Sequence, residues 1–102
     1  MSKDPQIGAI VKEVLELIKD ISPGKSVELR VPPYGAIQCV AGSNHRRGTP
    51  PNTVEMSGQT LLRLINEPSL WASLCDSGEV RASGLLSDLS KVFAQAAVKY
   101  IA

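Results

Sequence analysis

The sequence VELRVPPYGAIQCVAG occupies residues 27–42 and decides the fold. Its first part, Val27–Val31, alternates apolar and charged side chains, the pattern of a strand with one buried face. Pro32-Pro33 ends this strand, and a second alternating run follows over Ala36–Ala41. Because the period of the apolar residues is two on both sides of the prolines, the stretch predicts two strands of one sheet.

A helix precedes this stretch. Apolar residues recur at three- and four-residue steps from Ile7 to Ile21, as on one face of a helix. Asp4 is the predicted N-cap, and Pro5 suits the first turn. Ser22-Pro23-Gly24 ends the helix, because proline cannot continue it and glycine accepts unusual dihedral angles.

The downstream sequence predicts a strand, two helices, a strand and a terminal helix. These elements are Thr53–Met56, a helix capped by Ser57 and interrupted at Asn66-Glu67-Pro68, a helix over Ser69–Ser77, a strand over Glu79–Ser83, and a helix over Ser87–Ile101. Ser87 is the predicted N-cap of the last helix, and Asp88 lies in its first turn, where a negative charge suits the helix dipole.

This order of elements predicts the fold class. Strands and helices do not alternate strictly, which disfavours a doubly wound parallel sheet. We therefore expect an α+β fold with a mainly antiparallel sheet of about four to five strands, covered on one face by the N-terminal, middle and C-terminal helices. The chain has 102 residues, is 43% apolar and contains no linker, so residues 1–102 are expected to form a single domain.

Composition narrows the classes of function. Eleven Lys and Arg residues balance ten Asp and Glu residues, so no global field attracts nucleic acid or an anionic membrane, and any electrostatic function must be local. The sequence contains no signal peptide and no integral membrane segment, which predicts a cytoplasmic protein with Cys39 and Cys75 reduced. Neither cysteine has metal-ligand spacing, and we expect no metal and no cofactor.

Few residues are suited to catalysis. His45 is the single histidine, and common nucleophile, phosphate-binding, dinucleotide and zinc motifs are absent. A Cys39–His45 pair is conceivable, but a thiol that points into the core is disfavoured as a thiolate. We therefore expect no enzymatic activity.

Two local features have alternative interpretations. His45, Arg46 and Arg47 form the one dense cationic cluster, which either contacts an anion or is a solvated loop tip. Trp71 is the sole tryptophan, and it is either a core anchor or one wall of an apolar cleft. The facing wall would then be the apolar stripe of the C-terminal helix, which consists of Leu89, Val92, Phe93 and Ala96.

The order of elements and two stretches of sequence resemble a known superfamily. TVEMSGQTLLRLI at residues 53–65, followed by WASLCDSGEVRASG at residues 71–84, resembles the C-terminal half of the sterol carrier protein type two superfamily. The upstream run at residues 27–42, with HRRGTPPNTVE at residues 45–55, is more specifically similar to the short bacterial sterol-carrier-like proteins.

The resemblance implies a curved antiparallel sheet and helices that enclose an apolar tunnel. It also implies non-enzymatic binding or carriage of a small apolar or amphipathic ligand, such as a lipid, a fatty acid or an acyl-type molecule. The positions that it assigns to the pocket wall are Trp71, Leu74, Leu86, Leu89, Val92 and Phe93. On this view Arg46, Arg47 or His45 would meet a charged head group.

The size of the domain limits such a pocket. An empty cavity of about 300 Å³ would cost on the order of 7 kcal/mol, against a typical total stability of about 5 to 15 kcal/mol. The pocket is therefore expected to be small, filled with lipid, open as a cleft or covered by a second subunit.

The alternative function is a protein-interaction or accessory module without a ligand. It would use the polar sheet face, the Pro32-Pro33-Tyr34 turn and the His45–Arg47 loop. A homodimer remains open under either hypothesis.

Overall fold

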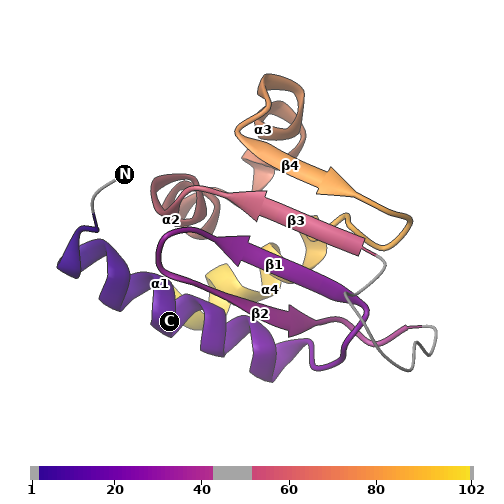
Figure 1. The fold of residues 1–102 in the computed structure, drawn as a ribbon, viewed down its shortest axis with the longest axis horizontal. Helices are drawn as coiled ribbons and strands as arrows, with labels where there is room; N and C mark the ends of the chain where they lie inside the picture. Colours follow the sequence, from indigo (N-terminus) through magenta and orange to yellow (C-terminus); the bar gives the residue numbers. More distant parts are fainter. Residues whose placement is uncertain (1–2, 43–51, 102) are drawn as a thin grey trace.

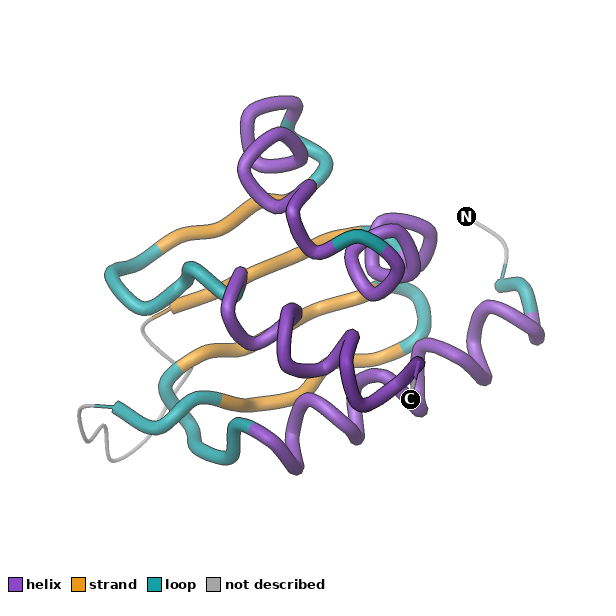
Figure 2. The backbone as a smooth tube through the Cα atoms, turned by 180° about the vertical axis from the view of Figure 1, so that it is seen from behind, coloured by secondary structure: helices purple, strands orange, loops and turns teal. Residues whose placement is uncertain are grey.

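The computed structural model describes residues 3–42 and 52–101, which form a sheet and a layer of helices on one of its faces (Figures 1 and 2). The elements in chain order are α1 (Pro5–Ile21), β1 (Val27–Val31), β2 (Gly35–Cys39), β3 (Asn52–Met56), α2 (Gly58–Asn66), the 3-10 helix η1 (Pro68–Leu70), α3 (Trp71–Ser77), β4 (Val80–Ser83) and α4 (Ser90–Ile101).

The sheet has four strands in the order β2-β1-β3-β4. β1 pairs antiparallel with β2, and β3 pairs antiparallel with β4, which confirms the mainly antiparallel sheet. The central pair β1–β3 is parallel, with Leu29 opposite Val54. It is parallel because the chain leaves β2 at the end of the sheet where β1 begins, and β3 starts from that same end (Figure 1).

The two faces of the sheet follow the alternation in the sequence. Val27, Leu29 and Val31 are fully buried under the helices, while Glu28 and Arg30 lie on the open face and form an ion pair of 2.8 Å. The cross-strand partners on β3 and β4, Glu55 and Arg81, also form an ion pair. Pairs of this kind between exposed side chains add little to stability.

The end of β2 differs from the prediction. The alternation predicts a strand to Ala41, but β2 ends at Cys39 because Val40 has a φ of 66°. Instead of continuing the strand, the Val40 N–H donates to the Ser22 carbonyl, and the Val40 carbonyl accepts from the Ser26 N–H. These bonds fasten the loop between α1 and β1 to the end of the sheet.

Both predicted caps at the starts of α1 and α2 are confirmed. The Asp4 carboxylate accepts the N–H groups of Gln6 and Ile7, and the Ser57 hydroxyl accepts the N–H of Thr60. Gly78, with a φ of 84°, ends α3 as expected.

The start of α4 differs from the prediction. Ser87 was the expected cap, but its hydroxyl donates to the Gly84 carbonyl within a tight turn. The Asp88 carboxylate instead accepts the Ser90 N–H at 2.9 Å, and this bond holds the pKa of Asp88 below its usual value. The helix therefore begins at Ser90, three residues later than predicted.

Candidate functional site

Of the six predicted wall residues, four are buried, one is partly buried and one lies at the surface. Trp71, Leu74, Leu89 and Phe93 belong to the single core cluster, with exposed fractions of 8%, 2%, 1% and 0%. Val92 is partly buried and packs against that cluster. Leu86 lies at the surface in the turn before α4, with 39% of its surface exposed.

Trp71 and Phe93 meet at the centre of the predicted cleft. Their ring centroids are 5.9 Å apart and the ring planes are tilted by 33°, a geometry in which aromatic rings attract one another. Of the two interpretations of Trp71, the structure shows the core anchor. The contact joins the segment of η1 and α3 to α4.

The segment formed by η1 and α3 is held to the core by few side chains. η1 has no buried residue, and α3 buries only Trp71 and Leu74. Neither helix has a side-chain N-cap. A segment with so few buried contacts opens at a lower free energy than a helix such as α1, which buries four apolar side chains.

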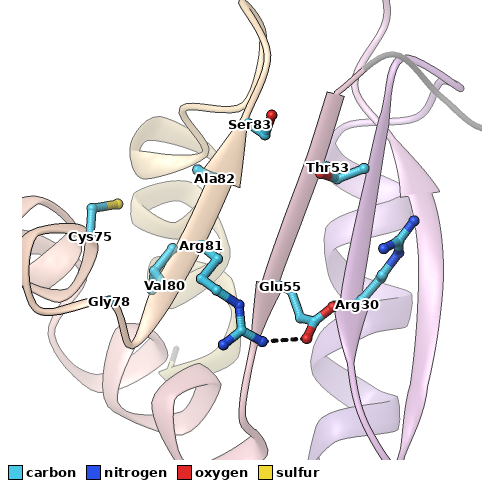
Figure 3. A pocket seen from close by; sticks show the side chains of 9 residues that line it. All are labelled: Arg30, Thr53, Glu55, Cys75, Gly78, Val80, Arg81, Ala82 and Ser83. Atoms are coloured by element: carbon cyan, nitrogen blue, oxygen red, sulfur yellow. Dashed lines mark hydrogen bonds and ion pairs between the residues drawn. The ribbon is translucent and has the colours of Figure 1, made fainter.

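A pocket of about 470 Å³ lies along β4 and is shown in Figure 3. It is lined by Arg30, Thr53, Glu55, Cys75, Gly78, Val80, Arg81, Ala82 and Ser83. The charges of Arg81 and Glu55 neutralise each other in their ion pair. Burial and the carboxylates of Asp88 and Asp76 raise the pKa of Cys75, so its thiol stays protonated at neutral pH and is a poor nucleophile.

A second pocket, of about 420 Å³, lies where α1 and α2 begin, and its wall includes Pro32 and Tyr34. The Tyr34 hydroxyl accepts the Asp4 N–H at 3.0 Å. The ring lies between two helix glycines, because a Cβ on Gly8 or Gly58 would stand 3.1 or 2.9 Å from a ring carbon. Gly8 was a sign of this arrangement in the sequence, since glycine inside a helix costs about 1 kcal/mol relative to alanine. A third pocket, of about 310 Å³, also has Pro32 in its wall.

The Cys39–His45 pair, which the sequence analysis disfavours, finds no support at Cys39. Its side chain is fully buried, and burial raises its pKa to about 11, as expected for a core thiol. His45, Arg46 and Arg47 lie outside the described residues. Within residues 3–42 and 52–101, no group of His, Cys, Asp and Glu side chains is arranged to hold a metal ion. In the same part of the chain, no helix has the length and apolarity needed to cross a bilayer.

The family of the chain follows from a comparison with protein families. The model of the bacterial SCP ortholog family matches residues 4–94. The chain belongs to this family. Membership confirms the resemblance to short bacterial sterol-carrier-like proteins. A search of curated proteins finds no match to this chain.

Solved structures share the fold of this chain. Six chains match, and one is described as "UbiJ-SCP2 Ubiquinone synthesis protein". The alignment covers 100% of this chain and 98% of that chain, with a TM-score of 0.55 and 17% sequence identity. At that identity the likeness concerns the fold, and it agrees with the predicted α+β sterol-carrier-like class.

Proposed function

We propose that this protein binds and carries a small apolar or amphipathic ligand, of lipid, fatty-acid or acyl type, without catalysing a reaction. Membership of the bacterial SCP ortholog family over residues 4–94 is the observation that carries this proposal. The solved neighbour, whose description joins SCP2 to ubiquinone synthesis, supports an apolar ligand class. Burial of Cys39, whose thiol stays protonated, agrees with a protein that does not act through a thiolate.

The proposed site lies between the segment of η1 and α3 and the facing side of α4. An acyl chain enters when the ring of Trp71 separates from Phe93, and the two rings and Leu74 then contact the chain instead of each other. Because the rings close the site when no ligand is bound, the protein avoids the cost of a permanent empty cavity. The small number of buried side chains on η1 and α3 makes this the least costly place to open the core.

The described residues on either side of the predicted cationic cluster lie beside Leu86. The Leu86 N–H donates to the Asn52 side chain at 3.0 Å, and a Cβ on Gly42 would stand 2.7 Å from a Leu86 methyl carbon. Gly42 and Asn52 flank the segment of the sequence that contains His45, Arg46 and Arg47. The proposed role of these cations is to bind the charged head of an amphipathic ligand.

Trp71 allows a direct test because it is the only tryptophan. We expect saturable binding of a fluorescent fatty acid, with energy transfer from Trp71 to the probe. Phe93→Asp places a charge against the acyl chain and should weaken uptake at least about tenfold, a conservative factor for the loss of one buried aromatic contact. Phe93→Leu provides a folded comparison that keeps the site apolar. The matched control is Val98→Asp on the same helix, where 70% of the residue is exposed, and it should bind as the wild type does.

Organic extraction and native mass spectrometry of untreated protein complete the test. We expect a bound lipid or fatty acid to be released. Well-folded protein that shows neither a bound apolar molecule nor saturable uptake would contradict a carrier function. The same spectrum reports the number of subunits and so tests the homodimer, while a cytoplasmic location and the absence of nucleic-acid binding stay predictions.

A ligand-free interaction module is the second candidate function. The observations that favour it are the open face of the sheet (Figure 1), which carries the Glu28–Arg30 and Glu55–Arg81 ion pairs, and the pocket walled by Pro32 and Tyr34. Under this hypothesis the wild type takes up no fatty acid, and Arg30→Glu with Arg81→Glu would abolish capture of a partner by the folded protein. Capture that survives in the folded double variant would contradict a role of the polar sheet face.

A further inference from the structure

β4 is an edge strand whose outer side is open. The strand order β2-β1-β3-β4 leaves one edge of the sheet at β2 and the other at β4. α1 packs against β2 and runs along that edge, whereas α3 flanks only the start of β4, where Val80 is buried (Figure 1). Within residues 3–42 and 52–101, the backbone of Val80–Ser83 forms hydrogen bonds only with β3. Alternate residues of β4 therefore direct N–H and C=O groups away from the sheet without a protein partner.

The burial of β4 differs from that of the two central strands. In β1 and β3 every second residue is buried, whereas in β4 only Val80 is buried. Ala82 is exposed, although it lies on the same face of the strand as Val80, because side chains two residues apart point the same way. The exposed stretch continues through Leu85, which is 101% exposed in the turn that follows. The helix layer thus leaves the second half of β4 uncovered.

The charges on and beside β4 do not protect its edge. Edge strands of soluble proteins often carry charged side chains that block pairing with another chain. Arg81 is the one charged residue of β4, and its side chain turns inward over the sheet to the Glu55 carboxylate of β3 (Figure 3). Glu79, just before the strand, is paired with Arg63 of α2. The edge therefore presents backbone groups and small side chains to a second strand.

We propose that two copies of this chain pair antiparallel through β4, with Ala82 on the two-fold axis, and so join the two four-stranded sheets into one. Each edge then supplies the backbone groups that the other lacks, and a two-fold axis is the commonest symmetry of homo-oligomers. With a net charge of +1 per chain, the two copies repel each other little. The proposal requires no bound ligand and goes beyond the carrier function.

Charge and strand length select this register. With Arg81 on the axis, two arginines would stand directly opposite each other, and like charges in that position destabilise a sheet. With Val80 on the axis, the second strand would meet α3, which flanks that end of β4. An axis at Ser83 would pair residues beyond Gly84, whose φ of 109° ends the strand. With Ala82 on the axis, Arg81 stands opposite Ser83 of the partner subunit, a small uncharged side chain.

Sedimentation velocity over a range of protein concentrations tests the proposal. We expect a weak dimer with a Kd on the order of 100 µM, because paired edges of four residues bury less than the roughly 1,200 Å² of a stable interface. Ala82→Glu should raise this Kd at least about tenfold, because it places two carboxylates opposite each other on the axis. Ala82→Lys should do the same with two ammonium groups. Both variants should keep the fold, because Ala82 is exposed.

An equimolar mixture of Ala82→Glu and Ala82→Lys tests the register. Opposite charges on the axis attract, so the mixture should form a mixed dimer at least as stable as the wild-type dimer, and native mass spectrometry identifies it by its mass. The matched control is Ala36→Glu, which makes the same change at an exposed position of β2, the strand at the other edge of the sheet. This control should dimerise as the wild type does.

Three results would overturn the proposal. They are a wild type that stays monomeric at millimolar concentration, equal weakening by Ala36→Glu and Ala82→Glu, and a mixture that forms no mixed dimer. The first result would leave a strand of another protein as the occupant of this edge.

Fatty-acid uptake separates this proposal from the carrier function. Ala82→Glu should take up the fluorescent fatty acid with wild-type affinity, because Ala82 lies outside the core cluster. Loss of dimerisation with intact uptake supports pairing through β4. A wild-type dimer that takes up no fatty acid would support this pairing and contradict the carrier function.

Discussion

Asn52 shows how one side chain joins distant parts of the chain. Its amide donates to the Ser26 carbonyl before β1, and its carbonyl oxygen accepts the Leu86 N–H before α4. The sequence alone gives no reason to single out this residue, because asparagine beside prolines is typical of loops. Its role arises from its position at the start of β3, between the buried carbonyl of Ser26 and the part-buried N–H of Leu86.

We expect Asn52→Ala to destabilise the protein by about 2 to 4 kcal/mol. The change removes the partner of the buried Ser26 carbonyl, and a buried unpaired group costs about 1 to 3 kcal/mol. It also removes the partner of the part-buried Leu86 N–H, which adds a smaller cost. Urea unfolding measures the effect. Asn66→Ala is the control, because the Asn66 amide donates to the Leu62 carbonyl in an exposed position, and it should change stability by less than about 0.5 kcal/mol. Equal effects of the two changes would show that Asn52 does not hold the turn.

Two glycines show two different reasons for which a position requires glycine, the backbone angle and the lack of space for a side chain. Gly24 and Gly78 both have positive φ angles, of 150° and 84°. A Cβ on Gly24 would stand 2.2 Å from the Val40 carbonyl oxygen, whereas a Cβ on Gly78 meets nothing within 4 Å. Position 78 therefore requires glycine only for its backbone angle, while position 24 requires it for space as well.

Among the elements, the segment formed by η1 and α3 differs from α1 in how few side chains anchor it to the core. α1 is anchored by four buried side chains and by the Asp4 cap, whereas α3 buries only Trp71 and Leu74, with Cys75 partly buried against the core. The periodicity of the sequence predicted one helix over Ser69–Ser77, and the structure divides this region at Trp71. Pro68 starts the first piece as a tight 3-10 turn, which brings Trp71 to Phe93.

We expect the amides of α3 to exchange with solvent at least about tenfold faster than those in the middle of α1. The physical reason is the lower free energy of local opening in a segment with few buried side chains. Hydrogen exchange followed by NMR measures both helices in one experiment. A saturating fatty acid should slow exchange in α3, and unchanged rates there in the ligand-bound protein would contradict the proposed place of entry.

Whole-molecule stability should depend on the ligand. If the proposed ligand binds the folded chain and not the unfolded one, a concentration of 100 times Kd adds about 2.7 kcal/mol. For a domain of about 100 residues this corresponds to a rise in Tm of roughly 10 to 20 °C, at about 4 to 8 °C per kcal/mol. Differential scanning calorimetry with and without a fatty acid measures the shift. Methyl-β-glucoside, which has no acyl chain, should leave Tm unchanged, and an equal shift with both compounds would argue against an apolar site.

The sequence by itself determined which segments form helices and strands and which face of each is buried. The alternation of Val27–Val31, the stripe from Ile7 to Ile21 and the Asp4 and Ser57 caps are local patterns, and burial of one face preserves them in the fold. The family resemblance was readable from the same residues, and the match over residues 4–94 confirms it.

Tertiary structure decided how those segments meet. It set the parallel pairing of β1 with β3, the contact of Trp71 with Phe93 and the position of the Tyr34 ring between two glycines. It also moved the end of β2 and the start of α4, where hydrogen bonds to distant or neighbouring carbonyls replaced the predicted continuation. Periodicity specifies only that a face is buried, whereas the partner of each face depends on packing between residues far apart in the chain.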